Sequence, residues 1–88
     1  MKVKHELQIT AKCPVDNVID EYECIVETEC LIQVESILDA AKPFTKQKLY
    51  QEALCADLAK AIGGDATVTL IGTHSGVKTT VTCHAYEG

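Results

Sequence analysis

The alternation of apolar and polar side chains constrains the fold of this chain more than any other feature. Residues 3–11 and 22–34 place apolar side chains at every second position, with mostly polar ones between them. This period of two is typical of β-strands that bury one face. Residues 66–73 and 77–86 indicate two further strands, joined by a hairpin at His74-Ser75-Gly76.

Between these two pairs of strands the pattern becomes helical. Residues 35–42 predict a short helix that Pro43 ends. Residues 46–62 carry a broad apolar stripe and predict a second helix, with Thr45 as its N-cap and Gly63-Gly64 as its stop.

The resulting order, β-β-α-α-β-β, defines the fold class. Layer packing favours an antiparallel sheet with both helices on one face, so we expect an α+β fold in a single domain over residues 1–88. Four strands leave two unpaired edges, and pairing of such edges between subunits predicts a homo-oligomer.

Charge and cysteine content exclude several classes of protein. Eight basic against thirteen acidic residues give a net charge of −5, which argues against nucleic-acid binding through bulk charge. No apolar run approaches the roughly 20 residues of a membrane span, and no basic-then-apolar leader is present. Five cysteines cannot all pair within one chain, and none forms a CxxC motif. We therefore expect no membrane association and reduced thiols in a cytoplasmic protein.

Position in the pattern separates one cysteine from the other four. Cys24, Cys30 and Cys83 fall on apolar strand faces and Cys55 falls in the apolar helix, so all four are expected to be small buried hydrophobes. Cys13 lies in the loop over residues 12–20, where we expect an accessible thiol.

Asp20 lies at the far end of that loop, seven residues after Cys13. If the loop doubles back, its carboxylate lies beside the thiol, an arrangement that suits a thiolate nucleophile with a proton donor. The alternative for Asp20 is a turn residue before a strand.

Glu52 lies in the second predicted helix. Its carboxylate has two acceptor oxygens, which suit the amidine-like edge of a guanine or pterin. The alternative is a solvated residue paired with Lys48. His5, His74 and His84 are widely separated, so a zinc site has little support and no metal is expected.

The loop and three other segments resemble a known family. The run from Cys13-Pro14 to Asp20 resembles the C-P-x5-D signature of the nitrile-processing tunnelling-fold family. Its two branches are the 7-cyano-7-deazaguanine reductases and the QueF-like amidinotransferases of archaeosine synthesis. The other similar segments are Val34-Glu35-Ser36, Tyr50-Gln51-Glu52 and Gly76-Val77.

The resemblance implies a role for each matching residue. Cys13 would attack a nitrile carbon and form a covalent thioimide, and Asp20 would carry the proton to and from the nitrile nitrogen. Glu52 would hold the guanine-like edge of the base. The resemblance also implies three further substrate-binding residues, namely Glu35, Ser36 and Gln51, the last in place of the family's usual histidine.

One departure from the family pattern decides between the branches. Reductases continue the Glu-Ser pair with a lysine-containing stretch that binds NADPH, whereas this chain continues with Ile37-Leu38-Asp39. An acidic and apolar segment is a poor cradle for a phosphate-bearing cofactor. The resemblance therefore implies a QueF-like amidinotransferase with ammonia as co-substrate and no other cofactor. The alternatives are an NADPH-dependent reductase, a pterin-pathway enzyme of the same fold, and a non-catalytic binding module.

The resemblance also implies partners. The substrate base would lie in a nucleic acid, most simply tRNA, and a local patch of Lys42, Lys46 and Lys48 would contact its phosphates despite the acidic total charge. The tunnelling fold (T-fold) implies an oligomeric barrel of subunits in a ring, such as a decamer of two pentamers.

Overall fold

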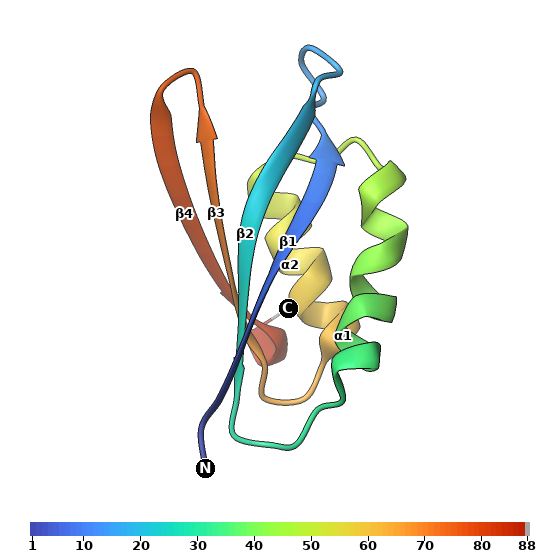
Figure 1. Ribbon diagram of the computed structural model, residues 1–88, viewed down its shortest axis with the longest axis vertical. Helices are drawn as coiled ribbons and strands as arrows, with labels where there is room; N and C mark the ends of the chain where they lie inside the picture. The colour runs from blue at the N-terminus through green and yellow to red at the C-terminus, as the bar shows by residue number, and fades with distance from the viewer. Residues whose placement is uncertain (88) are drawn as a thin grey trace.

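A computed structural model describes residues 1–87 of the chain. Its elements are β1 (Val3–Lys12), β2 (Ile19–Thr28), α1 (Val34–Ala41), the 3-10 helix η1 (Lys42–Lys46), α2 (Gln51–Ile62), β3 (Thr67–His74), β4 (Val77–His84) and the 3-10 turn η2 (Ala85–Glu87). The strands form one antiparallel sheet in the order β1-β2-β3-β4, and α1 and α2 cover one face of it (Figure 1). The predicted α+β class and element order are confirmed. Gly88, the last residue of the predicted domain, lies outside the described residues.

The core lies between the sheet and α2. Alternate residues of β2 and β3 are buried, as the period of two predicts, and they meet the apolar side of α2. Leu54, Leu58 and Leu70 are fully buried at this contact. Burial of each such leucine stabilises the fold by about 1.5–3 kcal/mol relative to an exposed one.

β2 ends earlier than its alternation predicts, at Thr28 rather than at residue 34. The cause is Asp65, whose carboxylate accepts hydrogen bonds from the Thr28 hydroxyl and from the backbone N–H of Glu29. These bonds turn the chain away from the sheet. Cys30 therefore lies outside the strand and is exposed, so its predicted burial on a strand face is wrong.

The second helix begins at Gln51, not at residue 46, and Tyr50 rather than Thr45 is its N-cap. Two backbone hydrogen bonds explain this. The N–H of Lys12 donates to the carbonyl of Gln47, and the N–H of Leu49 donates to the carbonyl of Lys12. They hold residues 47–49 extended in a parallel bridge against the end of β1, where a helix cannot begin.

The segment before this bridge also differs from the prediction. Pro43 does not end the helical stretch at once, because η1 continues through it with proline at an early position, where its missing N–H is tolerated. The hydroxyl of Thr45 donates to the carbonyl of Lys42 inside η1 and caps nothing.

The second hairpin forms where it was expected, but its turn has two residues rather than three, because His74 pairs with Val77 as the last residue of β3. β3 and β4 are joined by Ser75 and Gly76, with φ of 53° and 81°, which is the conformation that two-residue hairpins favour. β4 ends at His84 rather than at residue 86, and η2 begins at Ala85, whose N–H still donates to the carbonyl of Ala66.

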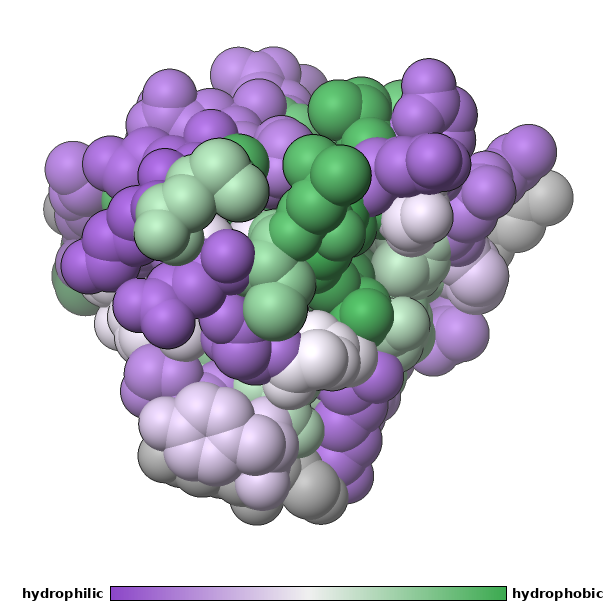
Figure 2. All heavy atoms as spheres, turned by 90° about the horizontal axis from the view of Figure 1, so that it is seen from below, coloured by the Kyte–Doolittle hydropathy of each residue, from purple (hydrophilic) through white to green (hydrophobic). Residues whose placement is uncertain are grey.

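The end of the molecule opposite this turn carries apolar surface. Seen from below, a stripe of apolar side chains lies between polar ones (Figure 2). Leu31, Val34 and Leu38, at and before α1, are all more than half exposed. Among the described residues, no helix is long and apolar enough to cross a membrane.

The two hydrogen bonds that Asp65 accepts, from Thr28 and Glu29, are called the Asp65 clamp below. This clamp makes folding stability depend on pH. Hydrogen bonds from the Thr28 hydroxyl and then from the Glu29 N–H lower the pKa of Asp65 below its ordinary value. A lowered pKa gives stability that is present above the ordinary value and is lost as pH falls through the folded one. We expect Asp65→Asn to lower the urea midpoint near pH 7 and to match the wild-type chain near pH 2.

The matched control for this change is Asp39→Asn on α1, where the carboxylate is exposed. Its urea midpoint should follow the wild-type value at both pH values. Equal midpoints for Asp65→Asn and Asp39→Asn at neutral pH would show that the clamp does not stabilise the fold.

Candidate active site

A cavity of about 260 Å³ opens where the sheet extends past the first turn of α2. Its walls come from the loop after β1, the start of β2, residues 49–52 and the end of β3. Four of the six predicted site residues line it, namely Cys13, Asp20, Gln51 and Glu52. The structure thus brings together residues that are up to 39 positions apart (52 − 13) in the chain.

Strand register explains this convergence. Cys13 follows Ile9 and Ala11 at alternate positions, and Asp20 precedes Tyr22 in the same way. All of them therefore face the helix-covered side of the sheet. Beyond the start of α2 this side has no helix over it, and the same pattern that fills the core then lines a cavity.

Hydrogen bonds hold the loop that carries Cys13. Its N–H donates to the carbonyl of Val18 at 2.8 Å, and its carbonyl accepts from the N–H of Asn17 at 2.9 Å. Asn17 has a φ of 62°, a left-handed conformation that asparagine tolerates better than most residues. The loop therefore doubles back, as expected. Cys13 is only 8% exposed, so the prediction of an accessible thiol is wrong for the single chain, although the residue lines the cavity.

The first turn of α2 forms the opposite wall. Residues 47–49 bridge to the end of β1 and so deliver Gln51 and Glu52 to the cavity. The side-chain amide of Gln51 donates to the carbonyls of Leu70 and Thr79, at 3.0 and 2.9 Å. Both of its N–H groups are therefore used within the fold, and only its carbonyl oxygen remains for a ligand.

Tyr22 forms the floor of the cavity and packs against Gly72. A Cβ atom at position 72 would lie 2.5 Å from Cδ1 of Tyr22, so only glycine fits under the ring. Burial, followed by the negative charges of Asp20, Cys13 and Glu52, raises the pKa of Tyr22 to about 12. Its hydroxyl therefore remains a neutral donor at physiological pH.

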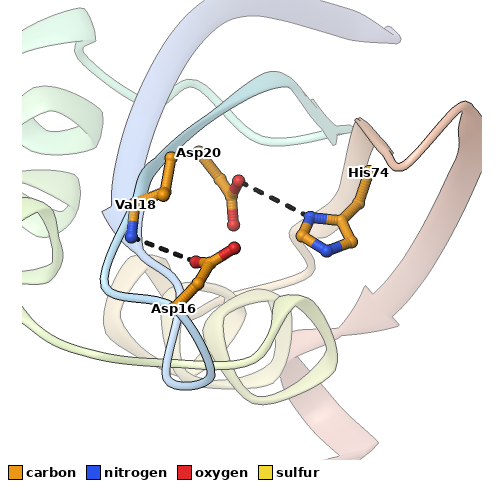
Figure 3. Close-up of polar contacts among 4 residues, drawn as sticks. All are labelled: Asp16, Val18, Asp20 and His74. Carbon is orange, nitrogen blue, oxygen red and sulfur yellow. Dashed lines mark hydrogen bonds and ion pairs between the residues drawn. The ribbon is translucent and has the colours of Figure 1, made fainter.

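Two residues at the site were not predicted from the sequence (Figure 3). The carboxylate of Asp16 accepts from the N–H of Val18 at 3.1 Å. This bond, followed by the Cys13 thiol, lowers the pKa of Asp16 and keeps it ionised. The imidazole of His74 points across the cavity mouth, with its Nδ1 3.9 Å from Oδ1 of Asp20.

A sequence signal for His74 did exist. It follows Val68, Leu70 and Gly72 at alternate positions of β3, so its register alone places it on the helix-covered face. Asp16 has no such signal, because it lies in a turn.

The other cysteines do not line this cavity. Burial raises the pKa of Cys24 to about 11 and that of Cys55 to about 12, so both remain thiols, as expected of core residues. Cys83 is half-buried on β4. Cys13 is thus the cysteine placed to react with a molecule in the cavity.

Glu35 and Ser36 lie apart from this cavity. They are exposed in the first turn of α1, which begins at the opposite end of the molecule from the Cys13 loop (Figure 1). Within one chain they do not join the other predicted site residues, and their role in substrate binding stays a prediction.

The histidines occupy three separate places. Nδ1 of His84 lies 2.8 Å from the Thr67 hydroxyl, whereas His74 faces Asp20. His5 lies in a groove between β1 and α1. Among the side chains that the structure describes, no three of His, Cys, Asp or Glu come together as a metal-binding group.

Comparison with known proteins is informative at the level of the structure. No protein-family model and no curated protein matches the sequence. Among solved structures, the fold is similar to that of the archaeosine synthase QueF-Like in its apo form, with a TM-score of 0.85. The match covers 96% of this chain and 92% of that one, at 18% sequence identity. This chain has the same fold as that protein.

That likeness confirms the tunnelling fold predicted from the sequence. The match extends over nearly the whole chain, so it includes the helices in addition to the sheet. The resemblance first found at residues 13–20 and 50–52 is thus confirmed at the level of the fold. On this fold, the chain places residues of both segments at one cavity.

The contact between Tyr22 and Gly72 gives a direct test of the cavity floor. Gly72→Ala would force the added methyl group into the ring, and overpacking of this kind costs about 1–3 kcal/mol. We expect a lower free energy of unfolding in urea. In a Tyr22→Leu background the same change should cost much less, because the ring atoms are absent. Equal costs in the two backgrounds would contradict this packing.

Proposed function

We propose that this protein is a QueF-like amidinotransferase that converts the nitrile of a 7-cyano-7-deazaguanine base into a formamidine. The observation that carries the proposal is the meeting of Cys13, Asp20 and Glu52 at one cavity. These are a nucleophile, a proton carrier and a carboxylate that suits a guanine-like edge.

The first half of the reaction forms a covalent intermediate. The sulfur of Cys13 attacks the nitrile carbon, and the carbon–nitrogen triple bond becomes a double bond. The thiol proton passes by way of Asp20 to the nitrile nitrogen, which gives a neutral thioimide. The phenol of Tyr22, beside Asp20, stays neutral and adds no negative charge there.

The second half releases the product. Ammonia attacks the thioimide carbon, a carbon–nitrogen bond forms, and the carbon–sulfur bond breaks. The sulfur leaves as the thiolate of Cys13 and regains its proton. The first turn of α2, on the opposite wall of the cavity, favours this step, because the partial positive charge of a helix N-terminus stabilises a nearby thiolate.

Two features of the segment after Ser36 favour this activity over the reductase alternative. The segment has no lysine, because Ile37, Leu38 and Asp39 follow Ser36. In addition, Ile37 of the segment that follows Ser36 is buried in the core. This segment therefore lacks the lysine that a phosphate-bearing cofactor needs, and its first residue faces the core.

The base would be presented within tRNA. Lys42 and Lys48 are exposed on the segments that lead to the cavity. Their positive charges offset the acidic surface locally, and local charge governs phosphate binding. The side chain of Lys46, the third residue of the predicted patch, lies outside the described residues.

A ring of subunits would complete the site. β1 and β4 are the edges of the sheet, and their pairing between chains would close an oligomeric barrel. Glu35 and Ser36, remote from the cavity of their own chain, would then serve the cavity of a neighbour.

Intact-protein mass spectrometry tests the chemistry. We expect the wild-type chain, incubated with 7-cyano-7-deazaguanine in ammonium-free buffer, to gain the full mass of the nitrile. Cys13→Ala should gain nothing, whereas Cys30→Ala, which changes an exposed cysteine away from the cavity, should behave as the wild type. The absence of an adduct across pH 6 to 9 would leave a non-catalytic binding module as the explanation. Consumption of NADPH with the same nitrile would instead establish the reductase.

Charge reversal tests the RNA surface. Lys42→Glu together with Lys48→Glu should weaken binding of a tRNA transcript at low salt by roughly tenfold or more and reduce the salt dependence of the affinity. The matched control is Lys4→Glu with Lys60→Glu, which makes the same change in net charge elsewhere. Equal losses for the two pairs would mean that RNA senses only the total charge.

A further inference from the structure

His74 lies where a proton can enter or leave the candidate active site. It lines the same cavity as Cys13 and Asp20, and its ring points at the Asp20 carboxylate (Figure 3). The Nδ1–Oδ1 distance of 3.9 Å allows an ion pair and leaves both atoms free for a small third group. The side chain of His74 is 61% exposed and that of Asp20 only 21%, so His74 is the solvent side of the pair.

The hairpin fixes this position. His74 pairs with Val77 as the last pair before the turn, and the left-handed backbone of Ser75 and Gly76 closes the turn in two residues. A two-residue turn leaves the end of β3 little freedom. The alternation of β3 then directs the imidazole to the helix-covered side, above Gly72.

No other group around the cavity offers the same chemistry. The titratable groups that face His74 are Cys13 and Asp16 of the loop, Asp20, Glu21 and Tyr22 of β2, and Tyr50 and Glu52 at the start of α2. On β4, Lys78 pairs with Thr73, so the alternation turns it to the other face of the sheet. Imidazole is the side chain among these that most often serves as a general base. Gln51 has no titratable proton, and both of its N–H groups are bonded within the fold.

We propose that His74 is the catalytic base that takes a proton from ammonium at the cavity mouth and relays it to Asp20. The inference rests on the proposed amidinotransferase activity and identifies the group that activates its co-substrate. The carboxylates of Asp16 and Asp20 beside His74 attract the cation, since a cleft lined by one sign of charge concentrates ions of the other sign.

The proton count closes without any other reactant. Ammonium gives one proton to His74 and attacks the thioimide carbon as ammonia. The proton passes from His74 to Asp20 and then to the Cys13 thiolate as the carbon–sulfur bond breaks. The two nitrogens of the product keep four hydrogens and a positive charge, so nitrile plus ammonium gives amidinium, and the thiol is restored.

Formation of the thioimide uses only the proton of the Cys13 thiol and does not require His74. His74→Gln should therefore form the covalent nitrile adduct as the wild type does in ammonium-free buffer. With ammonium chloride at about pH 7, its rate of amidine formation should fall roughly a hundredfold, which is typical of the loss of a general base. The difference should shrink towards about pH 9, where free ammonia is abundant without a base.

The matched control is His84→Gln, a histidine outside this cavity, which should retain the wild-type pH profile. Free imidazole should restore amidine formation to His74→Ala, which separates loss of a base from loss of the fold. A wild-type adduct with equal amidine rates for wild type and His74→Gln would overturn the role of His74 and leave the proposed function in place. Loss of the adduct in His74→Gln would also overturn the proposed role of His74. The absence of an adduct in the wild type would overturn both proposals.

Discussion

The short bridge between Lys12 and Lys48 is the contact on which the rest of this architecture depends. Its two backbone hydrogen bonds hold residues 47–49 extended and delay the start of α2 until Gln51. The 12 residues of α2 then span about 18 Å, whereas the 10 residues of β1 span about 33 Å. The sheet is therefore longer than its helical cover. The uncovered end of the buried face becomes the cavity, and the first turn of α2 becomes its wall.

Much of this could be predicted from the sequence, because strand register is a local property. Alternation alone places Cys13 and Asp20 on the same face, and the two-residue turn sets the second hairpin. What could not be predicted depends on contacts across the chain. The bridge at Lys48 is made by backbone groups, which leave no trace in the side-chain pattern, and the end of β2 is set by Asp65, 37 residues beyond Thr28.

The errors at the site have a similar origin. Cys13 was expected to be accessible because loops are exposed, yet hydrogen bonds to Asn17 and Val18 fold its loop tightly and bury the side chain. From the sequence, His74 is predicted to lie in a turn, with little support as a zinc ligand. Its register places it on the buried face, but its importance depends on Asp20, which approaches from a different strand. Pairings of this kind emerge only when the strands are placed side by side.

The hydrogen bonds of Gln51 have a mechanical consequence. Its amide ties the first turn of α2 to the carbonyls of Leu70 on β3 and Thr79 on β4, the two strands of the hairpin that carries His74. The carboxylate of Glu52 and the imidazole of His74 are thus tied to the second hairpin, while Cys13 and Asp20 belong to the first. β2 and β3 are paired only from Glu23 and Ile71 onwards, short of the residues that line the cavity. A change in the angle between the two hairpins would therefore change the distance between Cys13 and Glu52.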